Sequence, residues 1–188
     1  KVHFHYPQDG GDFSRALLRC VGVGECRKHS GTMCPSYMAT GEEMHSTRGR
    51  ARLLFETMQG GVLRGGWREP AMHEALSLCL SCKGCKGECP VHVDMATYKA
   101  EYMAHYYADR LRPRAAYAFG LVDRWARLAS LMPSLANAIA ASDAGSSLAK
   151  KALGIAPQRK LPRLSAKSFS RSFRPRPRTG LRRVLLWT

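Results

Sequence analysis

The chain contains the stretch Cys79-Leu80-Ser81-Cys82-Lys83-Gly84-Cys85-Lys86-Gly87-Glu88-Cys89-Pro90, a C-x2-C-x2-C-x3-C-P pattern. Two residues between successive cysteines let three thiolates turn inward from one loop onto a single iron-sulfur cluster. The fourth cysteine, Cys89, is followed by a proline and is carried away from that loop. In two-cluster ferredoxins the cysteine at this position ligates the other cluster. The run therefore predicts a second half elsewhere in the chain.

Three further cysteines lie upstream, and the last of them, Cys34, is again followed by a proline. Crosswise pairing of the two halves predicts two sites. One site contains Cys34, Cys79, Cys82 and Cys85. The other contains Cys20, Cys26 and Cys89. The second site is one ligand short, so it holds a three-iron cluster, is completed by a residue other than cysteine, or leaves one iron open to solvent.

The segment around Cys26 offers further candidate contacts to this second site. His29 is the nearest candidate for the missing ligand and His92 is the second, although an ordinary surface histidine is the commoner interpretation of His29. Gly22 and Gly24 permit positive φ, which would let backbone N–H groups approach an anionic cluster. An ordinary glycine turn is the alternative for these two residues.

Two other chemistries use clustered cysteines. A structural zinc site needs two C-x2-C knuckles around one tetrahedral ion, whereas here four thiols fall within eleven positions and a proline closes each half. Disulfide bridges would suit a secreted chain, but nothing here resembles a signal peptide, and seven cysteines would leave one unpaired. The pattern therefore favours iron and sulfide over zinc or disulfides.

The net charge of +16 is unevenly distributed. After Asp143 there are twelve basic residues and no acidic one, so residues 1–143, with 18 basic and 14 acidic residues, carry only +4. A nucleic-acid-binding face would alternate basic and aromatic side chains, but the tail has only Phe169, Phe173 and Trp187 among its charges. We therefore expect no nucleic-acid partner. No apolar run approaches the roughly 18 residues of a membrane span, so no transmembrane segment is expected.

Apolar periodicity predicts an all-α chain with helices over residues 13–19, 46–58, 70–78, 93–110, 114–131 and 134–153. Three of these helices should each bury one face. The faces are Ala51, Leu54, Phe55 and Met58; Met95, Tyr98, Tyr102 and Tyr106; and Tyr117, Leu121, Trp125 and Leu128. Residues 155–180 are rich in proline and arginine and are expected to form an extended basic linker.

Three arginines, Arg48, Arg50 and Arg52, cluster at the start of the helix predicted over residues 46–58, which Ser46 or Thr47 should cap. Positive charge at a helix N-terminus opposes the macrodipole. The arginines therefore need another reason, such as a reduced cluster, a flavin phosphate or an acidic partner surface. A solvated charged face is the alternative.

Four motifs together resemble one family. They are Cys20-Val21-Gly22-Val23-Gly24-Glu25-Cys26-Arg27, Gly31-Thr32-Met33-Cys34-Pro35-Ser36-Tyr37, Ser46-Thr47-Arg48-Gly49-Arg50-Ala51-Arg52 and Cys79-Leu80-Ser81-Cys82-Lys83-Gly84-Cys85. The chain is similar to the iron-sulfur segment of the large fused flavin-linked oxidases, which include dehydrogenases of D-lactate, D-2-hydroxyglutarate and glycolate. The resemblance implies a helical ferredoxin-like domain with 4Fe-4S clusters that carries electrons away from an FAD domain, where a D-2-hydroxy acid is oxidised.

The resemblance also implies an order of domains. Residues 1–12 would leave a preceding FAD domain, 13–110 would form the 4Fe-4S ferredoxin-like domain, 111–154 a helical extension, 155–180 the linker, and 181–188 the start of a C-terminal cysteine-rich domain. The chain begins at Lys1 and is expected to be a piece of a longer polypeptide. The expected cofactors are one 4Fe-4S cluster, a second 4Fe-4S or 3Fe-4S cluster, and FAD in the N-terminal domain.

The expected function is transfer of electrons from reduced flavin to a quinone or protein acceptor. The expected location is the cytoplasm or the periphery of the inner membrane, and association into an oligomer is compatible with this function. The sequence contains no dinucleotide-binding fingerprint or phosphate loop, so the chain is not expected to be catalytic alone. The alternatives are a nucleic-acid-binding protein with a structural cluster and a subunit that only scaffolds a complex.

Overall fold

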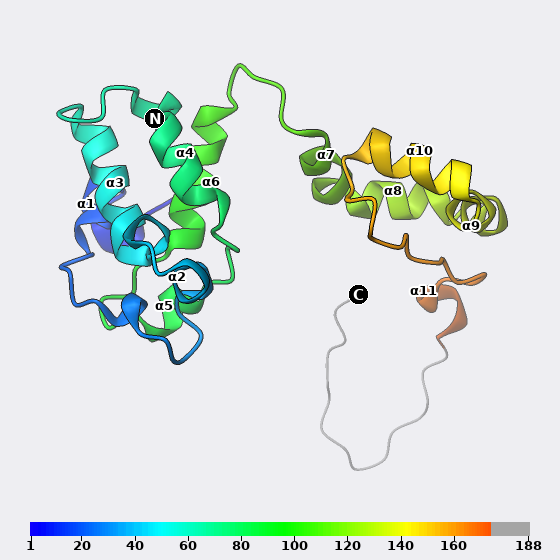
Figure 1. Ribbon diagram of the computed structural model, residues 1–188, viewed down its shortest axis with the longest axis horizontal. Coiled ribbons are helices and arrows are strands. Elements are labelled where there is room, and N and C mark those ends of the chain that lie inside the picture. Colours follow the sequence, from blue (N-terminus) through cyan, green and yellow to red (C-terminus); the bar gives the residue numbers. More distant parts are fainter. Residues whose placement is uncertain (174–188) are drawn as a thin grey trace, which may run out of the picture. The chain divides into compact units, whose positions relative to one another are not determined.

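The computed structural model describes residues 1–173, and no strand occurs within that range (Figure 1). The predicted all-α fold class is thus confirmed for the described residues, while residues 181–188, expected to begin a C-terminal domain, lie outside them. The chain divides into two compact units, Lys1–Leu111 and Arg112–Thr188. No helix between residues 1 and 173 is long and apolar enough to cross a membrane.

The first unit is built from α-helices joined by short 3-10 helices. Its α-helices are α1 (Phe13–Leu18), α2 (Pro35–Thr40), α3 (Thr47–Gln59), α4 (Pro70–Ser77), α5 (Gly84–Glu88) and α6 (Met95–Tyr106). Its 3-10 helices are η1 (Pro7–Asp9), η2 (Glu25–Arg27), η3 (Glu43–His45) and η4 (Gly66–Arg68). The helices predicted to begin near residues 13, 46, 70 and 93 all form, with ends shifted by a few residues.

Helix α3 begins where its cap and a glycine allow it to begin. The Ser46 hydroxyl accepts a hydrogen bond from the Gly49 N–H at 2.8 Å, which satisfies one of the unpaired donors of the first turn. A Cβ atom on Gly49 would lie 1.9 Å from the carbonyl oxygen of Glu43. The absence of a side chain at Gly49 therefore lets α3 pack directly on the backbone of η3.

The core of the first unit lies between α1, α3, α4 and α6. Its largest fully buried apolar side chains are Leu54, Met72, Leu76, Val93, Met95 and Tyr102. Of the face predicted on α6, Met95, Tyr98 and Tyr102 are buried and Tyr106 is half-buried. The Tyr98 hydroxyl donates to the carbonyl oxygen of Ala16 at 2.7 Å, which ties α6 to α1. This apolar stripe is confirmed as core.

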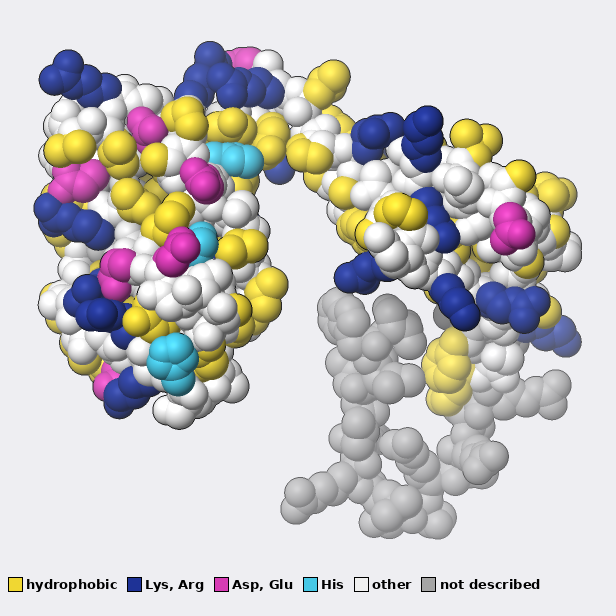
Figure 2. All heavy atoms as spheres, viewed as in Figure 1, with side chains coloured by type: hydrophobic (Ala, Val, Ile, Leu, Met, Phe, Trp, Pro, Cys, Tyr) yellow, Lys and Arg dark blue, Asp and Glu magenta, His cyan; other side chains and the backbone are white. Residues whose placement is uncertain are grey.

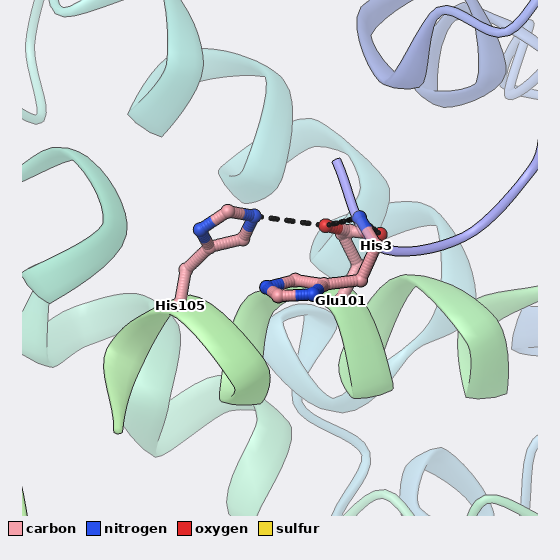
Figure 3. A group of neighbouring side chains, drawn as sticks. All are labelled: His3, Glu101 and His105. Carbon is pink, nitrogen blue, oxygen red and sulfur yellow. Dashed lines mark hydrogen bonds and ion pairs between the residues drawn. The ribbon is translucent and has the colours of Figure 1, made fainter. Parts of the chain in front are cut away.

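A buried carboxylate, Glu101 on α6, anchors the N-terminal segment (Figure 3). It accepts hydrogen bonds from the backbone N–H of His3 at 2.8 Å and of Phe4 at 2.9 Å, from the Tyr6 hydroxyl at 3.2 Å and from His105 Nε2 at 2.8 Å. His3, Glu101 and His105 offer ligand atoms within 4.8 Å of one another. Because four donors already occupy the carboxylate, the group serves as an anchor and not as an open metal site.

We expect Glu101→Gln to loosen the N-terminal segment, because the new amide would turn N–H groups toward donors that need an acceptor. The loss should be about 1–3 kcal/mol of unfolding free energy, with faster amide exchange at His3 and Phe4. Burial works most strongly to raise the pKa of Glu101, but the hydrogen bonds from His3 and Phe4 outweigh it and the pKa is lowered. The contribution is therefore complete above the unfolded carboxyl's pKa of about 4.3 and is lost as the pH falls through the lower folded value.

Urea unfolding at neutral pH and hydrogen exchange measure both effects. Glu74→Gln, on the exposed face of α4, is the matched control. Unchanged exchange at His3 in the Glu101 variant would show that the carboxylate does not hold this segment.

The second unit consists of short helices. They are α7 (Arg114–Gly120), α8 (Val122–Ala129), α9 (Pro133–Ala141), α10 (Asp143–Leu153) and α11 (Phe169–Ser172). The helix predicted over residues 114–131 is broken at Leu121, and the one predicted over residues 134–153 is broken at Ser142. Ser142 caps α10 by accepting from the Gly145 N–H at 3.2 Å, so Gly145 lies in the first turn of that helix.

The apolar face predicted on residues 114–131 is not buried, and that prediction is wrong. Tyr117, Trp125 and Leu128 are 42%, 47% and 62% exposed, and Leu121 is half-buried. Among the described residues of this unit only Ala118 is buried, because the helices are short and no second layer covers them. Hydrophobic as well as basic side chains therefore reach its surface (Figure 2).

Residues 155–168 follow α10 without forming a helix, and α11 then interrupts the segment that was expected to be extended. The Asn137 side chain of α9 holds this segment through two hydrogen bonds. Its amide donates to the carbonyl oxygen of Leu164 at 2.9 Å, and its carbonyl oxygen accepts from the Leu164 N–H at 2.8 Å.

Candidate iron-sulfur sites

One cavity of the first unit, called site A, is surrounded by four of the predicted ligands. They are Cys34, Cys79, Cys82 and Cys85. Cys34 directly precedes α2, whereas the other three lie on the loop that leads into α5 and in α5 itself. The fold thus brings together the four cysteines that crosswise pairing assigned to one site.

A second cavity, called site B, is lined by the remaining three cysteines. They are Cys20, Cys26 and Cys89. Cys20 follows α1, Cys26 lies in η2 and Cys89 comes directly after α5. Met33 and Thr47 line both cavities, so sites A and B adjoin.

Site B also borders a wider groove of about 650 Å³. Cys20, Val21 and Gly22 belong to the wall of both the site and the groove. Other residues that line the groove include Leu17, Leu53, Phe55, Arg48 and Arg52. Site B can therefore be approached along this groove.

Neither histidine considered for the missing ligand lies at site B. His29 is exposed, and its ring centroid lies 5.7 Å from that of Tyr37. His92 Nδ1 lies 3.1 Å from the carbonyl oxygen of Lys86, and its side chain lines a different cavity. The surface interpretation of His29 is the one that the structure supports.

Glu88, in the last turn of α5, clips the two cysteine-bearing segments together. Its carboxylate accepts from the N–H groups of Thr32 and Met33, both at 2.8 Å, and from the Thr32 hydroxyl. The hydrogen bond from the Thr32 side chain is the main cause of the lowered pKa of Glu88, with the two backbone donors adding to it. The sequence gives no signal for this contact, because the partners lie 56 and 55 residues apart.

We expect Glu88→Gln to weaken retention of iron. The new amide would place an N–H group opposite the N–H donors of Thr32 and Met33, so the segments that carry Cys34 and Cys89 would no longer be held together. Iron release to a chelator, followed by absorbance, should become several-fold faster. Glu74→Gln is again the control, since Glu74 is equally exposed and lies outside both cavities. Equal release rates in the two variants would show that Glu88 does not hold the two cysteine-bearing segments together.

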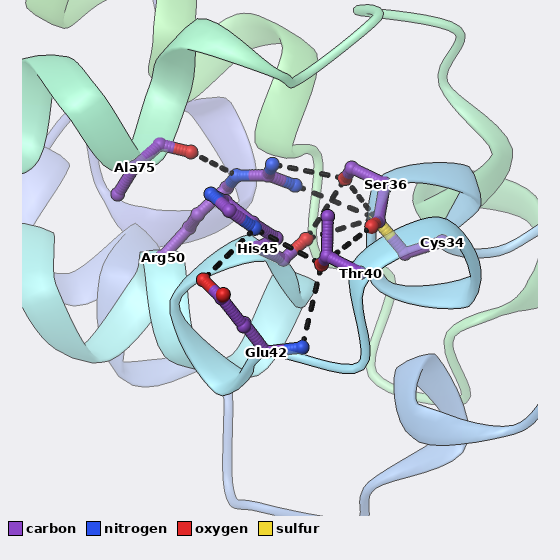
Figure 4. A network of polar contacts seen from close by, with 7 residues as sticks. All are labelled: Cys34, Ser36, Thr40, Glu42, His45, Arg50 and Ala75. Carbon is purple, nitrogen blue, oxygen red and sulfur yellow. Dashed lines mark hydrogen bonds and ion pairs between the residues drawn. The ribbon is translucent and has the colours of Figure 1, made fainter.

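Arg50 is fully buried and its guanidinium faces site A (Figure 4). Its Nε donates to the carbonyl oxygen of Ala75 at 2.7 Å, its Nη2 to the Ser36 hydroxyl at 2.9 Å and its Nη1 to the Cys34 sulfur at 3.4 Å. The Ser36 hydroxyl in turn donates to the carbonyl oxygen of His45 at 2.9 Å. A cation is thereby fixed beside one thiol of site A.

These contacts favour the thiolate at Cys34, which is the form that binds metal. Burial is the largest single influence and acts to raise the pKa of the Cys34 thiol, but the Ser36 hydroxyl and the Arg50 charge together lower it. Burial raises the pKa of both Cys26 and Cys85. Bound iron would remove that penalty by replacing the thiol proton.

The other two arginines at the start of α3, Arg48 and Arg52, have different roles. The Arg48 backbone N–H donates to the Cys26 sulfur at 3.3 Å, while its Nε pairs with Glu43 at 2.7 Å. Arg52 is exposed and pairs with Glu56 one turn further along α3. The solvated-face interpretation therefore fits Arg52, whereas Arg50 serves the site.

A second cation near site A was not foreseen from the sequence. Lys99 on α6 donates from Nζ to the carbonyl oxygen of Cys79 at 2.6 Å. Burial lowers the pKa of Lys99, and the nearby Arg50 charge acts in the same direction. The position of Lys99 follows from the packing of α6, so no local motif would have revealed it.

The arrangement of the sulfurs suits a cluster better than a single zinc ion. Four thiolates at Zn–S distances of 2.3 Å would place their sulfurs about 3.8 Å apart. Among the described residues, the one group of three or more His, Cys, Asp or Glu side chains placed to hold a single metal ion is His3, Glu101 and His105, and it contains no cysteine. The thiols instead line two cavities, and groups of cysteine thiolates are the donor set that iron-sulfur clusters use.

Comparison with known families decides between these chemistries. Residues 16–93 match the 4Fe-4S dicluster domain family. This segment is an iron-sulfur domain. The match covers all seven cysteines, and it agrees with the resemblance drawn from the four motifs.

Relatives of the iron-sulfur domain include D-2-hydroxyglutarate dehydrogenases and glycolate oxidase iron-sulfur subunits. D-2-hydroxyglutarate dehydrogenase of Pseudomonas putida is 29% identical over 164 residues, which are 70% of this chain and 16% of that protein. The glycolate oxidase iron-sulfur subunit of Escherichia coli is 31% identical over 74 residues, 39% of this chain and 16% of that subunit. The chain thus spans about a sixth of the relatives it matches. No solved structure matches the chain.

Proposed function

We propose that the iron-sulfur domain holds two clusters and relays electrons through them. The proposed ligands of the first are Cys34, Cys79, Cys82 and Cys85, and those of the second are Cys20, Cys26 and Cys89. The observation that supports this is the division of seven cysteines between two adjoining cavities. When bound, iron-sulfur clusters take up and release one electron at potentials set by charge, hydrogen bonds and exposure.

The surrounding residues would set the order of the two potentials. Arg50 and Lys99 place two cations at site A. At site B the Arg48 guanidinium pairs with Glu43 at 2.7 Å, and Glu43 also pairs with Arg27 at 3.2 Å. These two arginines are partly exposed and partly offset by a carboxylate, whereas Arg50 is buried and pairs with no carboxylate among the described residues. Because positive charge stabilises the more negative, reduced form of a cluster, we expect site A to have the higher potential.

The donor in this proposal is reduced FAD in a flavin domain of the same or an associated polypeptide, and the acceptor is a quinone or a protein. A C-terminal cysteine-rich domain would be a further partner. The names of the relatives support a D-2-hydroxy acid as the reductant, since they include D-2-hydroxyglutarate dehydrogenases and glycolate oxidase subunits. The domain would act in the cytoplasm or peripherally at the inner membrane.

The test uses the full polypeptide, or this chain together with its flavin partner. D-2-hydroxyglutarate, D-lactate and glycolate are each mixed with the anaerobic protein, and bleaching of cluster absorbance is followed by stopped flow. One of them should reduce the clusters at a rate no slower than turnover. Clusters that stay oxidised after the substrate has reduced the flavin, with no acceptor present, would show that the domain only scaffolds the enzyme.

A further inference from the structure

The two cysteine loops of the iron-sulfur domain have the same backbone course. Each begins with a cysteine that is followed by another six residues later, Cys20 and Cys26 in one loop and Cys79 and Cys85 in the other. In the first loop Gly22 and Gly24 have φ of 83° and 86°. In the second loop the residues at the same two positions, Ser81 and Lys83, also have positive φ, 54° and 60°. Such values are uncommon outside glycine, so their recurrence at matched positions indicates a repeated turn.

This repeat makes Val23 the counterpart of Cys82. Each lies between the two residues of positive φ, and each lines the cavity of its own site. Burial follows the same order in both loops: the first cysteine is half-buried, the middle residue is exposed, and Cys26 and Cys85 are buried. At 55% exposure Val23 stands where Cys82 stands at site A, and it has no donor atom.

No neighbouring side chain is free to replace the missing thiolate. Besides its cysteines, site B is lined by three residues with polar side chains, Glu25, Thr47 and Arg48. The Glu25 carboxylate pairs with the Lys28 ammonium at 2.6 Å. The Thr47 hydroxyl is neutral and a poorer ligand for iron than a thiolate, and the Arg48 guanidinium is cationic and pairs with Glu43.

We propose that site B binds its cluster through three cysteines alone, with the iron corner beside Val23 ligated by water or hydroxide and readily lost. This inference rests on the proposed two-cluster function and adds to it which corner is open. The adjoining groove, whose wall includes Val21 and Gly22, gives solvent and ions a route to that corner.

Loss of this iron is an oxidation with a simple balance. A four-iron core with two positive charges gives one electron to a one-electron oxidant such as ferricyanide and releases one ferrous ion. A three-iron core with one positive charge remains, and the three thiolates and four sulfides stay in place. Reduction in the presence of ferrous iron reverses the step. Site A, with four thiolates, keeps its iron under the same treatment.

The experiment compares Val23→Cys with the unmodified chain and with Val62→Cys as the control. Val62 is also an exposed valine, but it lines neither site nor the adjoining groove. Each anaerobic protein is treated with ferricyanide in excess over both clusters, because every iron lost consumes one oxidising equivalent, and released iron and the paramagnetic signal of oxidised three-iron clusters are measured. A second variant, Cys82→Val, creates the same open corner at site A, and a third, Glu25→Gln, removes the carboxylate nearest Val23 in the loop.

We expect about one iron per chain to be released from the unmodified protein, from Val62→Cys and from Glu25→Gln, and none from Val23→Cys. In Cys82→Val the amount should rise to about two. An unmodified protein that keeps about eight irons through the treatment would overturn the inference but leave the two-cluster function intact. So would loss of iron from Val23→Cys to the same extent as from the unmodified protein. A protein that binds no iron before treatment would instead overturn the proposed function itself.

Discussion

Cys89→Ser is expected to abolish the cluster at site B and leave the one at site A, although Cys89 lies in the same run as three cysteines of site A. The reason is geometric. Cys89 comes after α5 and lines the cavity that also contains Cys20 and Cys26. Cys34, from the upstream half, lines the cavity of the other three cysteines of the run. With only two thiolates left, site B should lose its core, and about four irons per chain should remain. Paramagnetic resonance of the reduced protein and iron analysis measure this loss.

Cys34→Ser is the reciprocal variant and serves as the control. It should damage site A, where Cys79, Cys82 and Cys85 would remain, and leave the signal of site B unchanged. Each variant should also be tested for unfolding by circular dichroism, so that loss of fold is not read as loss of one cluster. If Cys89→Ser removed the same signal as Cys82→Ser, the four cysteines of the run would share one cluster and the crosswise assignment would be wrong.

Arg50→Met is expected to lower the reduction potential of site A by an amount on the order of 100 mV. A unit charge several ångströms from the cluster contributes about 2–3 kcal/mol at an effective dielectric constant near 20, and 1.4 kcal/mol corresponds to 59 mV for one electron. Removing the cation disfavours the reduced state, so the shift is negative. The Ser36 hydroxyl and the carbonyl oxygen of Ala75 would also lose their donors. We therefore expect a loss of about 3–5 kcal/mol in unfolding free energy as well.

Arg50→Lys separates the two effects. It keeps the charge but cannot reproduce the three-way donation of the guanidinium, so the protein should be destabilised while the potential moves much less. Arg52→Met, on the exposed side of the same helix, removes a charge that is screened by solvent and paired with Glu56, and should change neither quantity measurably. A potential of site A that is equal in Arg50→Met and Arg52→Met would show that the buried cation does not act on the cluster.

The main helices of the first unit could be predicted because they depend on local spacing, and the crosswise grouping of the cysteines could be predicted because the C-x2-C-x2-C-x3-C-P run is typical of two-cluster ferredoxins. The capping role of Ser46 and the apolar stripe of α6 likewise depend on residues that are close in the sequence. Contacts that depend on how distant segments pack could not be predicted. Arg50 and Arg52 look alike in the sequence, and only the packing of α3 buries one and exposes the other.

In the second unit the sequence instead predicts a packing contact that the described residues lack. Periodicity over residues 114–131 predicts one amphipathic helix with a buried face, but the chain leaves the helix at Leu121, and the face has no partner layer among the described residues. A repeating apolar pattern shows which face could be covered and does not show that anything covers it. At Val23 the sequence does contain the signal, since three-residue spacing from Cys20 and Cys26 matches Cys82. The positive φ of Ser81 and Lys83 is what makes the match a structural one.

The most direct test is the metal and sulfide content of the anaerobically purified chain, measured with paramagnetic resonance of its oxidised and reduced forms. Two adjoining clusters predict about seven to eight irons and eight sulfides per chain, with signals that disappear site by site in the cysteine variants. A folded protein that contained zinc in place of iron, with no acid-labile sulfide, would contradict the account.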